Sequence, residues 1–255
     1  MIEAVNLGFK YLNSSNKILS NISFRIRENE LVLILGPSAS GKTTLAYCIS
    51  GIIPHIIDGE LEGKVLIQGK DIQDLEFSEI SRKVGVVLQN PEAQIFGMTV
   101  EEDIAFGLEN LGFDTDTIRE KIDHWLGMFD LLEYKKINPR FLSGGQKQKL
   151  VIASVMAMDP EIIILDEPFV NLDQKGKVTL LKTLFKSKKN GKTIILIDKK
   201  VPNFLELVDR VIILSQEGRL LFASTPNKFL KIMDSFSNLG IFAPRDQPVK
   251  LVSVR

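Results

Sequence analysis

The stretch GPSASGKTT, residues 36–44, constrains the fold of this chain more than any other feature. It fits the pattern G-x-x-x-x-G-K-[ST], directly after the apolar run Leu31–Leu35 and before a run with helical spacing that begins at Lys42. Glycines let the backbone bend so that several N–H groups face a phosphate, and the helix N-terminus adds a favourable dipole. This context favours a phosphate-binding loop over a chance glycine-rich turn.

The whole loop is a candidate for binding a nucleotide. Lys42 is predicted to reach the β- and γ-phosphates, and the Thr43 hydroxyl is predicted to bind Mg²⁺. The candidate nucleotide-binding residues of the loop are Gly36, Pro37, Ser38, Ala39, Ser40, Gly41, Lys42, Thr43 and Thr44.

Five short apolar runs predict buried strands in an α/β fold. Each run is continuous rather than alternating in apolarity, which indicates a sheet covered on both faces and hence largely parallel. The runs are Leu31–Leu35, Val84–Leu88, Ile162–Leu165, Thr193–Ile197 and Arg210–Leu214. Three more runs alternate and predict an antiparallel edge sheet: Ile2–Phe9, Ile18–Ile26 and Gly63–Gln68.

The strand signal vanishes between residues 100 and 158. The stretches Glu101–Leu111 and Thr115–Leu132 have helical spacing instead. We therefore expect a helical subdomain over about residues 91–158, inserted between strands of the parallel sheet.

Composition excludes several classes of protein. The 255 residues include 32 Lys+Arg and 32 Asp+Glu, so the net charge is zero and gives no overall electrostatic attraction to nucleic acid. The single cysteine, Cys48, excludes an intramolecular disulfide and suits a reducing cytosol. The N-terminus does not resemble a secretion signal, and no apolar run approaches the ~18 residues that span a bilayer. If this protein serves a membrane process, we expect the membrane part to be another chain.

The stretch IIILDEP, residues 162–168, predicts the acidic half of the same site. A buried strand delivers Asp166 to its C-terminal edge, where ligands bind in open α/β sheets. Asp166 is expected to hold Mg²⁺, and Glu167 to orient or polarise an attacking water. An acidic pair that ends a strand is, taken alone, more often a helix cap or a solvated loop. The phosphate-binding loop upstream favours the functional interpretation.

The stretch LSGGQKQ, residues 142–148, indicates the family. Ser143 and Gln146 form the pattern of a helix capping box, and Gly144 and Gly145 at a helix start also suit an anion. The stretch resembles the LSGGQ signature of the ATP-binding cassette (ABC) family. In that family two cassettes dimerise head to tail, and each ATP lies between one chain's phosphate-binding loop and the other chain's signature.

Three further positions match the family. Gln89 resembles the Q-loop glutamine, which contacts Mg²⁺ or the attacking water, and Asp173 in Asn171-Leu172-Asp173 resembles the D-loop at the dimer interface. Tyr11 resembles the aromatic residue that stacks on adenine. A core or edge-strand tyrosine is the alternative interpretation of Tyr11.

The resemblance covers roughly residues 2–222 and implies the fold and its division. It implies a RecA-like P-loop NTPase fold with an antiparallel β subdomain, as an ABC ATPase domain over residues 1–225. Leu220–Phe222 is expected to close a hairpin, and residues 226–255 to form a short helical extension with a tail.

Two stretches resemble the ATPases of energy-coupling-factor (ECF) transporters, which drive uptake of vitamins and transition-metal ions. They are Gly51–Val65 and Gln89–Gly107, in which Gln94 is characteristic, and the tail Leu239–Pro248 is also similar. This resemblance implies an ATP-hydrolysing subunit on the cytoplasmic face of the membrane. Its expected partners are a second ABC ATPase subunit, a transmembrane coupling subunit and a substrate-binding membrane subunit. The alternatives are an ATPase of another ABC importer class and a non-transport ABC ATPase.

Two residues depart from the family pattern. Ala39 stands where the loop usually has a glycine, which costs little if that position keeps a negative φ. Lys199 stands at the switch histidine, and both histidines, His55 and His124, lie before Asp166. Lysine can contact a phosphate as a cation, but stays charged at pH 7 and has no acceptor nitrogen.

We therefore expect Lys199 to support ATP binding and to position water poorly, so that this chain pairs with a different cassette. The alternative is that hydrolysis proceeds normally with Lys199 in place.

Overall fold

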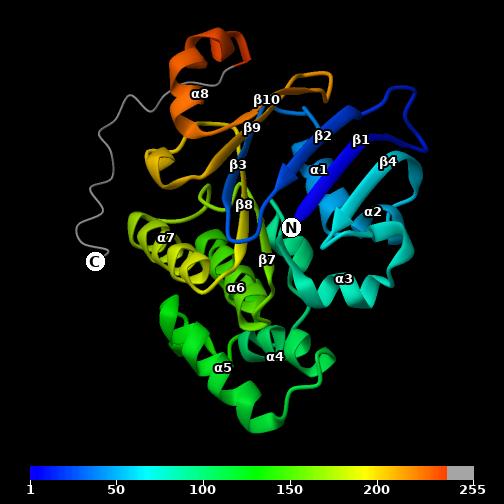
Figure 1. Ribbon diagram of the computed structural model, residues 1–255. Helices are drawn as coiled ribbons and strands as arrows, with labels where there is room; N and C mark the ends of the chain where they lie inside the picture. The colour runs from blue at the N-terminus through cyan, green and yellow to red at the C-terminus, as the bar shows by residue number, and fades with distance from the viewer. Residues whose placement is uncertain (240–255) are drawn as a thin grey trace.

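Two β-sheets form the centre of the molecule, with helices around them (Figure 1). This computed structural model describes residues 1–239. The larger sheet has six strands in the order β10-β9-β3-β8-β7-β6, and the smaller has four in the order β2-β1-β4-β5. The strands are β1 (Ile2–Tyr11), β2 (Leu19–Ile26), β3 (Leu31–Leu35), β4 (Gly59–Ile67), β5 (Lys70–Asp71), β6 (Val84–Val87), β7 (Ile162–Asp166), β8 (Thr193–Asp198), β9 (Arg210–Leu214) and β10 (Leu220–Ser224).

The larger sheet is parallel except at one edge. β3 pairs in parallel with β8 and β9, and β7 pairs in parallel with β6 and β8. β10 is antiparallel to β9, which confirms the expected closing hairpin. All five predicted buried strands are present, so the predicted α/β class with a mostly parallel sheet is confirmed.

Both faces of the larger sheet are covered, as continuous apolarity predicted. In β3, Leu31, Leu33 and Leu35 join one core with side chains of α6 and α7. Val32 and Ile34 join a second core with α1 and the smaller sheet. Successive side chains of a strand point to opposite faces, so one apolar run supplies both cores.

The smaller sheet is antiparallel, as expected. β1 pairs with β2 on one side and with β4 on the other. β4 begins at Gly59, earlier than the predicted Gly63. Gly63 has φ +71°, and a Cβ there would lie 2.3 Å from the Val5 carbonyl oxygen, so the strand bends at this glycine without ending.

The helices lie mostly in the middle of the chain, and α4 and α5 project to one end of the molecule (Figure 1). The α4 start is fixed by a capping box between Thr99 and Glu102. The α-helices are α1 (Lys42–Ile49), α2 (Ile52–His55), α3 (Phe77–Lys83), α4 (Val100–Asn110), α5 (Thr115–Met128), α6 (Gly144–Ala157), α7 (Gln174–Lys189) and α8 (Pro226–Ile232).

The two predicted helical stretches correspond to α4 and α5. α8 follows β10, where a short helix was expected. The similar tail over residues 239–248 lies, beyond Leu239, outside the described residues. Within residues 1–239, no helix combines the length and the apolarity that crossing a membrane requires.

Candidate nucleotide site

Three neighbouring strands end at one edge of the larger sheet and position the candidate site. In the register of the sheet, Leu35 at the end of β3 pairs with Asp198, and Asp166 at the end of β7 pairs with Ile197. Because β3, β7 and β8 are parallel, the segments that follow them begin side by side. These segments start at Gly36, Glu167 and Lys199, which sequence analysis had selected separately.

A cavity of about 360 Å³ opens at this edge. Its lining includes most of the predicted phosphate-binding loop, together with five residues from other parts of the chain. The lining residues are Tyr11, Ile18, Ser38, Ala39, Ser40, Gly41, Lys42, Thr43, Thr44, Gln89, Glu167 and Lys199. Ile18 was missed in the sequence, since an apolar residue before a strand has no signature of its own.

Lys42 is held inside the loop. Its Nζ donates to the carbonyl oxygens of Gly36 at 2.8 Å and Pro37 at 2.6 Å. The side chain is buried, and burial lowers the pKa of Lys42 below its ordinary value, against the opposing charges of Glu167 and Asp166. The loop thus places a fixed cation where a phosphate is predicted to bind.

The three predicted Mg²⁺ ligands supply oxygen donors that suit a hard cation. Thr43 Oγ1 donates to Asp166 Oδ2 at 2.5 Å, and Gln89 lines the same cavity. Asp166 is buried, and this burial raises the pKa of its carboxyl group despite the Thr43 hydrogen bond. A hydroxyl beside a carboxylate fits Mg²⁺, which binds proteins through few oxygen ligands.

The backbone of the loop bears on the cost of Ala39. Its φ is +62°, so the condition under which alanine would cost little is not met. Alanine in the left-handed region costs about 1 kcal/mol, whereas glycine adopts it freely. Gly41 has φ +87° and a Cβ there would lie 2.7 Å from Leu19 Cδ2, so this glycine is required by both conformation and space.

Glu167 is the second residue of the site, glycine apart, in the left-handed region. Its φ is +49°, and its N–H donates to the Ile197 carbonyl oxygen of β8 at 2.9 Å. Its Oε1 lies 3.0 Å from Lys199 Nζ. Two of the predicted catalytic residues, which follow separate strands, are therefore in direct contact.

Asp198 fixes the backbone that carries Lys199. Its Oδ1 accepts the N–H of Lys199 at 2.6 Å and that of Lys200 at 3.1 Å. Burial raises the pKa of Asp198, against these two hydrogen bonds. The sequence signal for this role is a short acceptor side chain at a strand end.

Tyr11 lies on the rim of the cavity and also packs against the sheet. Its hydroxyl lies 3.0 Å from Thr44 Oγ1, and its ring meets Phe9 edge-on at 4.8 Å between centroids. Both interpretations of Tyr11 are compatible with this position, because the residue packs against Phe9 and also lines the cavity.

The signature residues lie away from this cavity. Ser143 and Gln146 form the predicted capping box, with the Gln146 N–H donating to Ser143 Oγ at 3.3 Å and the Ser143 N–H donating to Gln146 Oε1 at 2.8 Å. Gly144 has open space around it, whereas a Cβ on Gly145 would lie 2.7 Å from the Asn171 carbonyl oxygen.

Asp173 caps α7 by accepting the Gly176 N–H at 2.8 Å. It therefore lies with the signature residues outside the cavity of this chain's own phosphate-binding loop, as does the segment Asn171–Asp173.

Gln94 holds the end of β6, just before Gln89. Its Oε1 accepts the Leu88 N–H at 2.6 Å and its Nε2 donates to the Val86 carbonyl oxygen at 2.9 Å. The amide thus continues the hydrogen bonding of β6 beyond the strand end and fixes the backbone next to Gln89.

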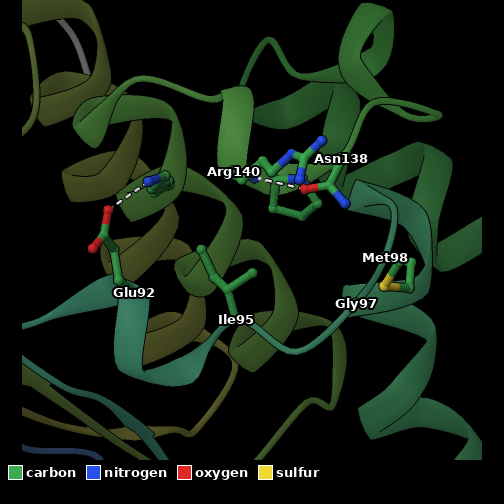
Figure 2. A pocket seen from close by; sticks show the side chains of 8 residues that line it. Glu92, Ile95, Gly97, Met98, Asn138 and Arg140 are labelled. Atoms are coloured by element: carbon green, nitrogen blue, oxygen red, sulfur yellow. Dashed lines mark hydrogen bonds and ion pairs between the residues drawn. The ribbon is translucent and has the colours of Figure 1, made fainter.

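An ion pair joins the segment after Gln89 to the signature helix. Lys147 Nζ in α6 lies 2.5 Å from Glu92 Oε1, at one side of a cavity of about 400 Å³. Figure 2 shows Glu92 on one side of this cavity, with Arg140, Asn138 and Met98 on the other. The predicted Q-loop and signature regions are therefore in contact within one chain.

Comparison with known proteins agrees with this geometry. The family model described as ABC transporter matches residues 19–170. A Pyrococcus horikoshii protein named as an ABC transporter ATP-binding protein is 38% identical, over 96% of this chain and 86% of its own length. A similarly named Streptococcus mutans protein is 41% identical over 90% of this chain, which spans only 41% of that relative.

Two solved structures have the same fold. CbiO1 from Clostridium perfringens, described as part of the ABC transporter complex CbiONQ, has a TM-score of 0.75 and 28% identity, with 94% of each chain covered. The ATP-binding cassette MJ0796, described as a dimeric post-hydrolysis state bound to ADP and Pi, has a TM-score of 0.78 and 27% identity, with 89% of this chain and 99% of that chain covered. The chain described here belongs to the ABC transporter family, as an ATP-binding cassette of the P-loop NTPase fold.

Proposed function

We propose that this ABC ATPase powers an ECF-type importer of a vitamin or a transition-metal ion, from the cytoplasmic face of the membrane. The observation that carries the proposal is the cavity at the strand ends, where Lys42, Gln89 and Glu167 line one space. The CbiO1 neighbour, described as part of a CbiONQ complex, supports assembly with membrane subunits.

Each residue of the cavity has a proposed role. Lys42 binds the β- and γ-phosphates, and the loop around it supplies backbone N–H groups. Thr43, Asp166 and Gln89 hold Mg²⁺, which neutralises charge on the phosphates when bound. Glu167 orients the attacking water, and Tyr11 stacks on the adenine.

A groove beside the helical subdomain is the proposed docking site for helices of the transmembrane coupling subunit. It has a volume of about 510 Å³ and lies between α3, α4 and α6. Phe96 and Phe106 line it, 6.1 Å apart between ring centroids, and are 72% and 56% exposed. Large exposed aromatic side chains in a groove are typical of protein–protein anchors, and an amphipathic helix fits such a surface.

We further propose that the chain works in a heterodimer with a second cassette. Its own loop would form a site with Lys199 at the switch position, which retains ATP and hydrolyses it slowly. Its Ser143–Gln146 signature would complete the partner's site. Several relatives are more than twice as long as the matched segment, which leaves room for a second domain of this size.

The phosphate-binding loop is tested with Lys42→Ala. Calorimetry on the purified chain should show loss of MgATP binding with an unchanged circular dichroism spectrum. Lys70→Ala, at an exposed lysine of β5, is the matched control and should bind as the unsubstituted chain does. Unchanged affinity in the Lys42→Ala chain would refute the proposed site.

The unequal sites are tested in the assembled transporter. Ser143→Arg puts bulk and charge into the partner's site, so it should reduce total ATPase activity more than Glu167→Gln, which affects only the slow site. The heterodimer proposal is contradicted if Glu167→Gln reduces total ATPase activity more than Ser143→Arg does. It is also contradicted if the isolated chain hydrolyses ATP as fast as the assembled complex. Lys199→His should raise the rate of this chain's own site.

A further inference from the structure

Lys199 and Glu167 form an ion pair inside the candidate nucleotide cavity. Lys199 Nζ lies 3.0 Å from Glu167 Oε1, and both residues line the cavity. The Glu167 side chain is only 8% exposed, whereas that of Lys199 is 42% exposed. Removing one partner of a nearly buried ion pair is costly, so Lys199 matters to Glu167.

The other cation of the cavity is already engaged. Lys42 Nζ donates to Gly36 and Pro37 carbonyl oxygens and lies 3.4 Å from Ser40 Oγ. Within the described part of the chain, the one ion pair of Glu167 is with Lys199, and Lys199 has no other. The charge of Glu167 is therefore balanced by the Lys199 side chain, which can move away from it.

Lysine has the properties that such an exchange requires. Its ammonium is a compact charge on a flexible four-carbon stem, and its half-exposed position lets it rotate without disturbing the core. Asp198 holds the Lys199 backbone N–H at 2.6 Å, so the side chain can move while its backbone stays fixed. Ser38–Thr44 of the phosphate-binding loop line the same cavity, within which a bound phosphate would compete with Glu167 for the ammonium.

We propose that Lys199 exchanges Glu167 for the terminal phosphate of a nucleoside triphosphate, and that this exchange makes the site discriminate ATP from ADP. The proposal rests on the proposed nucleotide site. ADP lacks the terminal phosphate and leaves the ion pair intact. ATP gains a contact with Lys199 but has to break the pair, and the breakage releases the Glu167 carboxylate.

A double-mutant cycle on the full chain tests the exchange. Affinities for ADP and for a non-hydrolysable ATP analogue are measured by calorimetry for the unsubstituted chain, Glu167→Gln, Lys199→Met and the double variant. Glu167→Gln removes the pair that ATP has to break, so it should tighten analogue binding about three- to tenfold and leave ADP unchanged. In the Lys199→Met background this gain should be at least about threefold smaller.

Two matched variants control for charge. Lys200→Met removes the same charge from the next residue, which is exposed, and its effect should add to that of Glu167→Gln without coupling. Lys199→Arg keeps the cation and should retain the coupling. The proposal is overturned if Glu167→Gln tightens analogue binding equally with Lys199 in place and in the Lys199→Met background. It is also overturned if the Lys199→Met chain binds the analogue as tightly as the unsubstituted chain.

Lys42→Ala separates this failure from failure of the nucleotide site itself. If Lys42→Ala binds the analogue normally, the site is wrong. If Lys42→Ala loses binding while Glu167 and Lys199 act independently, the site stands and only the exchange is wrong.

Discussion

Asp103 holds the groove-lining segment of the helical subdomain, and its removal should be costly. It lies in α4 with 7% exposure. Its Oδ1 accepts the N–H groups of Phe96 at 2.9 Å and Gly97 at 3.2 Å, and its Oδ2 accepts the Ser154 hydroxyl of α6 at 3.0 Å. One carboxylate therefore fastens residues 96–97 to two helices.

The cost of Asp103→Ala follows from these bonds. Ser154 keeps its hydrogen bond to the Leu150 carbonyl oxygen at 3.0 Å, whereas the Phe96 and Gly97 N–H groups lose their acceptor. Both hydrogen bonds are part-buried, and a hydrogen bond to a charged group contributes about 1.5–3 kcal/mol, so the free energy of unfolding should fall by about 2–4 kcal/mol. Asp103→Asn keeps an acceptor oxygen and should cost about 1–2 kcal/mol.

Urea unfolding followed by circular dichroism measures this change. Glu109→Ala, at an exposed position of the same helix, is the control and should stay within about 0.5 kcal/mol of the unsubstituted chain. Because Phe96 lines the proposed docking groove, Asp103→Ala should also weaken co-purification with the membrane subunits. If the Asp103→Ala chain is as stable as the Glu109→Ala chain, the reasoning is refuted. If Asp103→Asn destabilises the chain as much as Asp103→Ala does, the effect comes from the lost charge.

Three further predictions concern buried and half-buried groups away from the cavity. Burial raises the pKa of the Cys48 thiol to about 12, so iodoacetamide at neutral pH should label it only after unfolding, and labelling of the folded chain would contradict its burial. Gln148 is 1% exposed and its Nε2 has no hydrogen-bond partner within residues 1–239, so Gln148→Met should stabilise the chain by about 1 kcal/mol in urea unfolding. Burial tends to raise the pKa of Glu30, but hydrogen bonds from Arg210 and the Arg27 N–H outweigh it and hold that pKa below its ordinary value. Its stabilisation is therefore complete above the unfolded pKa and is lost as the pH falls through the folded one, so the stability difference from Glu30→Gln should shrink below about pH 4.

Much of the larger sheet could be predicted because its signals are local. Runs such as Leu31–Leu35 are apolar at every position, and both faces of that strand pack in the structure. The start of β4 was missed because Glu60 and Glu62 are acidic, and their strand partners in β1 could not be read from the segment itself. Strand pairing supplied the hydrogen bonds that local propensity did not favour.

The site was predicted residue by residue, but its conformations were not. A motif specifies that Ala39 belongs to the phosphate-binding loop, whereas the left-handed φ at that residue comes from the path of the loop between β3 and α1. Similarly, Gln94 was singled out by resemblance, and its role as a clamp on Leu88 and Val86 required coordinates. Hydrogen bonds between a side chain and a distant backbone have no periodic signature in a sequence.

Lys199 shows most clearly what strand order adds to a sequence. In the chain, Glu167 and Lys199 are separated by α7 and one strand, and a comparison of motifs treats Lys199 as a lost histidine. In the sheet, β7 and β8 are parallel neighbours, and the Glu167 N–H bonds to Ile197, so the two side chains leave adjacent strand ends. In the structure, Lys199 therefore makes a charged contact with Glu167. Ser143 and Gln146, which are proposed to serve only the partner's site, keep the full signature and its capping box. We propose that Lys199 is a changed switch position, and a changed switch beside an unchanged signature is the pattern that a division of labour between two cassettes would produce.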